Sequence, residues 1–143
     1  MAQELLIVPA LIMGTIIGVI ELLFVHADEA GMGWLGHGLH AIPTMMLFIF
    51  ASMNVDWVLH FFGTSEAKLG LWVVVAVRAV IAIIATLKIG AAAAIAGRVG
   101  EKIYHSLIVG CMVAAAPYIW LFALGPLIRP IWPKVWQAGF LKI

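Results

Sequence analysis

Four long apolar stretches constrain the fold of this chain more than any other feature of its sequence. They cover about residues 5–25, 39–62, 69–96 and 103–128. A helix needs about 20 apolar residues to cross the hydrocarbon core of a bilayer, and each stretch has that length. Inside lipid the backbone polar groups must be bonded within the segment, and the period-two alternation of a barrel strand is absent. We therefore expect four transmembrane helices.

The composition excludes an ordinary soluble domain. Of the 143 residues, 65% are hydrophobic and 10% are charged, whereas soluble domains contain about 45–50% apolar and about 25% charged residues. A small domain leaves much of its surface exposed, so it has no room to bury this much apolar area. The predicted fold class is all-α integral membrane, with one transmembrane domain over residues 1–143 and the lipid bilayer as its partner.

Short polar connections separate the four apolar stretches. The first connection spans residues 26–38 and is rich in glycine, the second spans 63–68, and the third spans 97–102. Short connections place consecutive helices side by side in opposite directions, which predicts an up-down-up-down four-helix bundle. The first stretch lacks the basic residues that open a signal peptide, so we interpret it as a retained span.

The C-terminal tail, residues 126–143, differs from the spans. Its prolines oppose a regular helix, and its aromatic residues alternate with basic residues. Aromatic rings beside cations suit the headgroup region, so we predict a Pro/Trp-rich tail in the membrane interface. Docking of the tail on a partner subunit is the alternative. The residues concerned are Pro126, Pro130, Pro133, Trp132, Trp136, Phe140, Arg129, Lys134 and Lys142.

The basic residues predict the orientation in the membrane. An even number of spans places both termini on one side, and that side holds more Lys and Arg than the other. The residues are Lys68, Arg129, Lys134 and Lys142 on the side of the termini, and Arg98 and Lys102 on the opposite side. Because cytoplasmic loops carry the excess of positive charge, we expect a multi-pass protein with both termini in the cytoplasm.

Charged residues inside the spans are candidates for a functional site. A charge at the bilayer centre costs about 2.5–3.5 kcal/mol on insertion scales, so each one needs a partner or water. The helix order allows two ion pairs, Asp56 with Arg78 and Glu21 with Lys88, and Asn54 lies beside Asp56. Such pairs either lock helices together or line a path for an ion or proton. Arg78 is the deepest charge and the leading candidate.

Histidines gather toward one end of the predicted bundle. His26, His37 and His40 lie in or beside the first connection, and His105 opens the fourth span on the same side. Imidazoles with nearby carboxylates bind zinc, copper or iron, and two histidines from different helices can hold a haem. A metal ion or haem is therefore a candidate cofactor. A pH-sensitive loop, or ordinary capping and hydrogen bonding, is the alternative.

Small residues recur four positions apart in the spans. Gly14 and Gly18 form a G-x-x-x-G motif, and Gly110 with Ala114 repeats the spacing. Small residues let helix backbones approach closely. The sequence offers more such faces than one four-helix bundle needs, so we expect self-association or contact with other membrane subunits.

Three prolines lie within the apolar stretches. We expect Pro117 to kink the fourth span and to free a backbone carbonyl, because proline has no N–H to donate. We expect Pro9 and Pro43 to occupy the first turn of their helices, where the missing N–H has no cost.

No catalytic signature is present in the sequence. It lacks the phosphate-binding, dinucleotide-binding, His-Glu-x-x-His and Gly-x-Ser-x-Gly motifs, so we expect no enzyme, although an embedded acid/base site stays open. The net charge of +1 and the lack of a basic stripe argue against nucleic-acid binding. The favoured function is a homo-oligomeric ion channel or small transporter that uses the intramembrane charges. The alternatives are a non-catalytic subunit that anchors a larger membrane complex and, less favoured, a metal- or haem-binding redox subunit.

Overall fold

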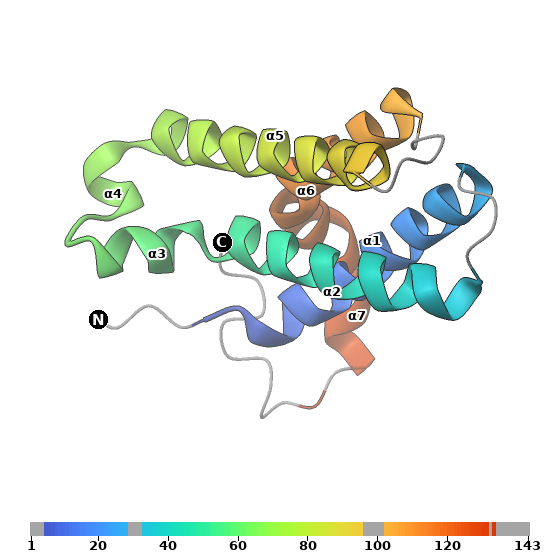
Figure 1. Cartoon of the computed structure of the whole chain (residues 1–143). Coiled ribbons are helices and arrows are strands. Elements are labelled where there is room, and N and C mark those ends of the chain that lie inside the picture. Colours follow the sequence, from blue (N-terminus) through green and yellow to red (C-terminus); the bar gives the residue numbers. More distant parts are fainter. Residues whose placement is uncertain (1–4, 29–32, 96–101, 132, 134–143) are drawn as a thin grey trace.

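The computed structural model describes residues 5–28, 33–95, 102–131 and 133, and these residues are helical with no strand. The helices are α1 (Ile7–Asp28), α2 (Trp34–Met53), α3 (Val55–Phe61), α4 (Glu66–Leu69), α5 (Leu71–Ile95), α6 (Ile103–Ile119) and α7 (Gly125–Ile128). A π-helical turn, Trp120–Leu124, joins α6 to α7, and a 3₁₀ turn, Arg129–Ile131, follows α7. In Figure 1, α5 runs along the top of the molecule, with α2 and α1 below it.

Four helical segments are long and apolar enough to cross a bilayer. They are Ile7–Asp28, Trp34–Met53, Leu71–Ala91 and Ile103–Ile131. Their outward faces carry large apolar side chains, such as Trp72 at 82% and Phe122 at 76% exposure. Soluble monomers rarely expose contiguous apolar surface on this scale. The all-helical fold and the four long apolar helices that the sequence predicts are thus confirmed.

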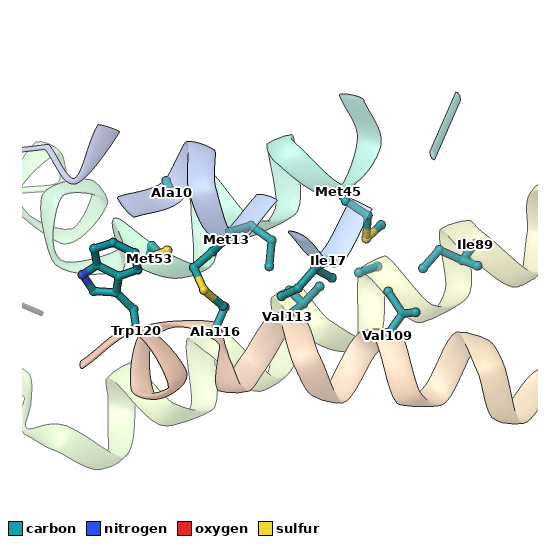
Figure 2. Packing of buried hydrophobic residues seen from close by; sticks show 12 residues of the cluster. Ala10, Met13, Ile17, Met45, Met53, Ile89, Val109, Val113, Ala116 and Trp120 are labelled. Carbon is teal, nitrogen blue, oxygen red and sulfur yellow. The ribbon is translucent and has the colours of Figure 1, made fainter. Parts of the chain in front are cut away.

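The core is a strip of apolar side chains between the helices. Met13 and Ile17 of α1 meet Met45 and Ile49 of α2, and side chains of α5 and α6 close the strip from the other side. Figure 2 shows this packing, with the indole of Trp120 at one end of the strip. Dispersion contacts of this kind drive helix association in lipid, where apolar burial alone gives no advantage.

The glycine motif of α1 serves the contact between α1 and α2. A Cβ on Gly14 would lie 3.0 Å from the Met46 Cα, and a Cβ on Gly18 would lie 3.1 Å from the Ile42 Cα. The order of these contacts shows that the two helices run antiparallel. Gly110 of α6 lies equally close to α5, so small faces that the sequence offers for self-association are used within the chain.

The first connection is shorter than the sequence indicates. α1 continues to Asp28 and α2 begins at Trp34, whereas the predicted connection covers residues 26–38. Gly36 and Gly38 lie within α2, although each glycine costs a helix about 1 kcal/mol relative to alanine. Because α2 begins at Trp34, Pro43 lies inside the helix, and the prediction that it occupies the first turn is wrong. Pro9 is the third residue of α1 and so does lie in the first turn, as predicted.

The second predicted span, 39–62, is interrupted. α2 ends at Met53 and α3 begins at Val55, with Asn54 in a non-helical conformation at φ −113° and ψ 27°. Short polar side chains such as that of asparagine compete for backbone hydrogen bonds and so weaken a helix locally.

The tail begins as helix, which the sequence does not predict. Pro126 occupies the first turn of α7, where a proline is tolerated, and the chain stays helical to Ile131. Trp132 and residues 134–143, with the aromatic and basic residues of the predicted interfacial tail, lie outside the described residues.

We expect Gly110→Ala to destabilise the protein by about 1–3 kcal/mol, the usual cost of overpacking a tight contact. The added Cβ would clash with Oγ1 of Thr86 and would lie 3.1 Å from the carbonyl oxygen of Ala82, so α5 and α6 must separate. Thermal unfolding of the purified protein in detergent measures the loss.

Gly90→Ala is the matched control, because it adds the same methyl group to the facing helix. Its Cβ would meet only the Ser106 Oγ, at 4.0 Å, and alanine favours a helix over glycine by about 0.5–1 kcal/mol. We expect an unchanged or slightly higher unfolding temperature. Equal losses in both variants would contradict the role given to the close approach at Gly110.

Candidate functional site

Two helix interruptions create buried backbone groups that need partners. Pro117 of α6 has no N–H, so the carbonyl of Val113, four residues earlier, loses its helical donor. The π-helical turn at Trp120–Leu124 begins three residues later. On α2, the end of the helix at Met53 leaves the Ser52 carbonyl among the last carbonyls without a donor in the same helix.

Ser52 connects these two interruptions. Its hydroxyl donates to the carbonyl oxygen of Val113 at 2.7 Å and so replaces the donor that Pro117 lacks. Its own carbonyl accepts a hydrogen bond from Nε of Arg78 at 3.2 Å. Ser52 is completely buried, and both bonds lie inside the bundle. One residue of α2 thus holds α6 through its side chain and α5 through its backbone.

The Arg78 side chain is 4% exposed and lies between α5, α2 and α6. Its Nη1 donates to the Tyr118 hydroxyl at 2.9 Å, and its guanidinium carbon lies 5.1 Å from the centre of the Tyr118 ring. A cation within about 6 Å of an aromatic face is attracted to it. Among the described residues, the partners of the guanidinium are therefore neutral: a carbonyl, a hydroxyl and an aromatic ring.

Asn54 completes the polar cluster at the end of α2. Its Oδ1 accepts a hydrogen bond from the backbone N–H of Leu6 at 2.7 Å, and its Nδ2 donates to the Phe50 carbonyl at 2.9 Å. The first N–H groups of a helix have no partner within the helix. Asn54 therefore satisfies the start of α1 from a neighbouring helix. We name Ser52, Asn54, Arg78 and Tyr118 the arginine cluster.

The predicted ion pair between Asp56 and Arg78 is wrong. Oδ1 of Asp56 accepts the backbone N–H of Glu66 at 2.7 Å, and Oδ2 lies 4.0 Å from His60 Nε2. The break at Asn54 places Asp56 on α3, where it turns toward the start of α4. Within the described part of the chain, no carboxylate lies within ion-pair distance of Arg78.

The predicted pair between Glu21 and Lys88 is not formed either. The Lys88 ammonium lies on the surface, 3.4 Å from the Thr44 hydroxyl. Glu21 is buried on α1, and α1 packs mainly against α2 and α6, so α5 does not bring Lys88 to it.

The four histidines divide into separate contacts at the other end of the bundle. His26 Nδ1 lies 3.1 Å from His37 Nδ1, and the His26 ring stacks on Trp34 with 3.6 Å between ring centres. His105 Nδ1 lies 2.5 Å from Oδ2 of Asp28. His40 is exposed on α2. Among the described residues, no three His, Cys, Asp or Glu side chains converge as metal ligands.

A haem does not fit the His26–His37 pair. The two Nδ1 atoms are in hydrogen-bonding contact, so no room remains between them for a porphyrin plane with both imidazoles as axial ligands. The pair therefore narrows the predicted four-histidine site to two imidazoles and removes haem from the candidate cofactors at this position.

Asp28 joins the end of α1 to the start of α6. In addition to His105, its carboxylate accepts the backbone N–H of Lys102 at 3.0 Å and lies 3.3 Å from the Lys102 ammonium. A negative charge at a helix N-terminus is favourable, because it satisfies free N–H groups and the helix dipole. Residues 28 and 102, which are far apart in sequence, are therefore held together.

Sequence reasoning missed Ser52 and Tyr118. The rule that a proline frees the carbonyl four residues earlier pointed to Val113, but nothing in the sequence indicated which neighbouring helix supplies the donor. Tyr118 had a weaker signal in the sequence. It follows Pro117 directly, and the other tyrosine of this span, Tyr104, lies in its first turn.

The comparisons with known proteins add no relative. No protein-family model, no curated protein and no solved structure matches the chain.

We expect Ser52→Ala to destabilise the protein by about 1–3 kcal/mol, because it leaves the buried Val113 carbonyl without a donor. Pro117→Ala restores an N–H four residues after Val113. In the double variant the loss caused by Ser52→Ala is therefore expected to shrink, and a double-mutant cycle of unfolding free energies measures this coupling.

Ser106→Ala is the matched control for the serine substitution. Ser106 is as buried as Ser52, but its hydroxyl has no hydrogen-bond partner among the described residues. Removing that hydroxyl is expected to leave stability unchanged or to raise it slightly. If the effects of Ser52→Ala and Pro117→Ala simply add, the proposed replacement of the missing donor is refuted.

Proposed function

We propose that this chain is a multi-pass membrane protein that moves a small anion through a site at Arg78. In this proposal the four long helices form an up-down-up-down bundle with both termini in the cytoplasm. The antiparallel contact of α1 with α2 supports the arrangement, as does the antiparallel contact of α5 with α6, in which Gly90 faces Ser106 and Gly110 faces Thr86.

The observation that carries the proposal is the buried charge of Arg78, which has no carboxylate within ion-pair distance in the described part of the chain. A buried cation without a counter-charge is expensive, and neutral acceptors repay only part of the cost of removing it from water. The arginine cluster keeps a net positive charge, since its other described groups are neutral. An anion at this point would remove the penalty, so the electrostatics favour an anion over a cation.

The donors at the cluster suit an anion as well. A guanidinium has five N–H groups, and the described contacts of Arg78 use two of them. The Tyr118 oxygen accepts from Arg78, so its own O–H remains able to donate to another group. Two side chains from different helices thus offer hydrogen-bond donors at one place.

The depth of Arg78 is that of an intramembrane site. It lies seven residues after Leu71 at the start of its span, or about 10 Å along the helix at 1.5 Å per residue. The core around the cluster is filled by apolar side chains such as Trp120, which is fully buried. A packed core suits a transporter that opens the site to each side in turn better than a permanently open pore.

Self-association is part of this proposal. The outward faces of the four long helices carry large apolar side chains, which can contact either lipid or a second copy. The glycine motif on α1 does not contribute to such a contact, because α2 covers it.

The alternative proposal is a structural subunit of a larger membrane complex. One specific observation favours it. The described hydrogen bonds of Ser52 and Arg78 join α2, α5 and α6 to one another at the helix interruptions, as in a purely structural contact. In the transport proposal Arg78 binds an anion in addition to holding α2 and α6, whereas in the structural proposal it only holds these helices.

We expect purified protein in liposomes to conduct or exchange chloride or nitrate, and Arg78→Gln to reduce this flux at least about tenfold. Losing one hydrogen bond to a charged group is worth about 1.5–3 kcal/mol, which corresponds to that factor or more. Arg78→Lys keeps the charge and is expected to retain part of the flux. Anion-specific electrodes or quenching of an entrapped halide-sensitive dye measures the rate.

Lys88→Gln is the control, because it removes a positive charge from the same helix at an exposed position. It is expected to leave the anion flux unchanged. Absence of flux from well-folded protein, together with purification in fixed stoichiometry with unrelated membrane subunits, would overturn the transport proposal in favour of the structural one.

A further inference from the structure

We propose that His26 and His37 form a two-histidine site for a divalent transition metal, with copper(II) the preferred ion, at the joint between α1 and α2. The site is independent of the arginine cluster and of the transport proposal, because it lies at the opposite end of α2. Figure 1 shows the end of α1 and the start of α2 side by side at the right of the molecule.

The distance between the two ring nitrogens fits a shared metal ion. The Nδ1 atoms are 3.1 Å apart, whereas the ring centres are 5.3 Å apart, so each ring turns its Nδ1 toward the other. With metal–nitrogen bonds of about 2.0–2.1 Å, a separation of 3.1 Å gives an angle of about 100° at the metal. That angle lies between those of square-planar and tetrahedral coordination. Because the two Nδ1 atoms now point almost directly at each other, each ring must rotate to turn its lone pair toward a shared ion, while the helices stay in place.

The two helices that carry the ligands are held together before any metal arrives. His37 is 2% exposed in the first turn of α2, and His26 lies in the last turn of α1 with its ring stacked on Trp34. The close contact of α1 with α2 at Gly14 and Gly18 fixes the relative position of the helices. A site assembled in advance on rigid helices loses little entropy when it binds an ion.

The proton balance of binding is simple. Each neutral imidazole carries one N–H, and a hydrogen bond between the two Nδ1 atoms places one of these protons between the rings. When a metal binds both Nδ1 lone pairs, each ring keeps its proton on Nε2. One ring changes tautomer, and no proton is released to solvent from the neutral pair.

Imidazole ligands favour copper(II) among the divalent first-row metals. With these two nitrogens as the ligands from the described residues, water or an added small ligand fills the remaining coordination positions. The other two histidines do not complete the site: His105 holds Asp28 through its Nδ1, and His40 is exposed on α2.

The test uses untagged full-length protein in detergent and copper(II) supplied as its glycine complex, which suppresses weak surface binding. We expect one copper per chain, with two equatorial imidazoles detected as combination lines in pulsed electron paramagnetic resonance. In His26→Gln and in His37→Gln we expect one imidazole and an affinity at least about tenfold lower, since loss of a ligand exceeds the 10–100-fold effect of outer-shell changes.

His40→Gln and His60→Gln are the matched controls, and both are expected to keep two imidazoles and the original affinity. If His37→Gln does not fold, His26→Gln carries the test, because His26 is less buried. A single-imidazole signal in the unmodified protein overturns the proposal, as does no binding against glycine, or a two-imidazole signal that survives His26→Gln.

Discussion

Every backbone N–H and C=O inside a bilayer needs a partner, and this requirement governs the structure of the chain. The helices satisfy it over most of their length. At the end of α2 and at Pro117 they do not, and there side chains of other helices donate the missing hydrogen bonds: Arg78 to the Ser52 carbonyl and Ser52 to the Val113 carbonyl. Ser52, Asn54 and Tyr118 lie at or beside these interruptions and Arg78 binds at one of them, so the arginine cluster and the two interruptions form one unit.

The same principle operates at the ends of the helices, where side chains from elsewhere in the chain satisfy free N–H groups. Asp28 does so for the start of α6, Asp56 for the start of α4, and Asn54 for the start of α1. Each contact joins a helix start to a neighbouring element, so capping and tertiary assembly are achieved together. This explains why Asp56 is unavailable to Arg78, and why that guanidinium keeps its charge among neutral groups.

Much of the fold could be predicted from the sequence, because the length and apolarity of a span are local properties. The helical class and the four long helices follow from them directly. Pairings between helices could not be predicted in the same way. The Asp56–Arg78 prediction assumed an unbroken second span. The break at Asn54 starts a separate helix, α3, and Asp56 on that helix binds the start of α4 instead of Arg78. The long first connection was predicted from its glycines, but α2 includes Gly36 and Gly38 despite their low helix propensity.

The double role of Ser52 has a consequence for how this protein tolerates mutation. The link from Ser52 to Val113 depends on a hydroxyl and disappears when the new residue has no side-chain donor, whereas the link from Ser52 to Arg78 uses a main-chain oxygen that every amino acid possesses. Evolution can therefore loosen α6 from α2 by a single codon change while leaving the grip of α2 on Arg78 intact. Substitutions at position 52 alone therefore do not reveal the hydrogen bond that holds the Arg78 guanidinium, because they leave the main-chain oxygen in place.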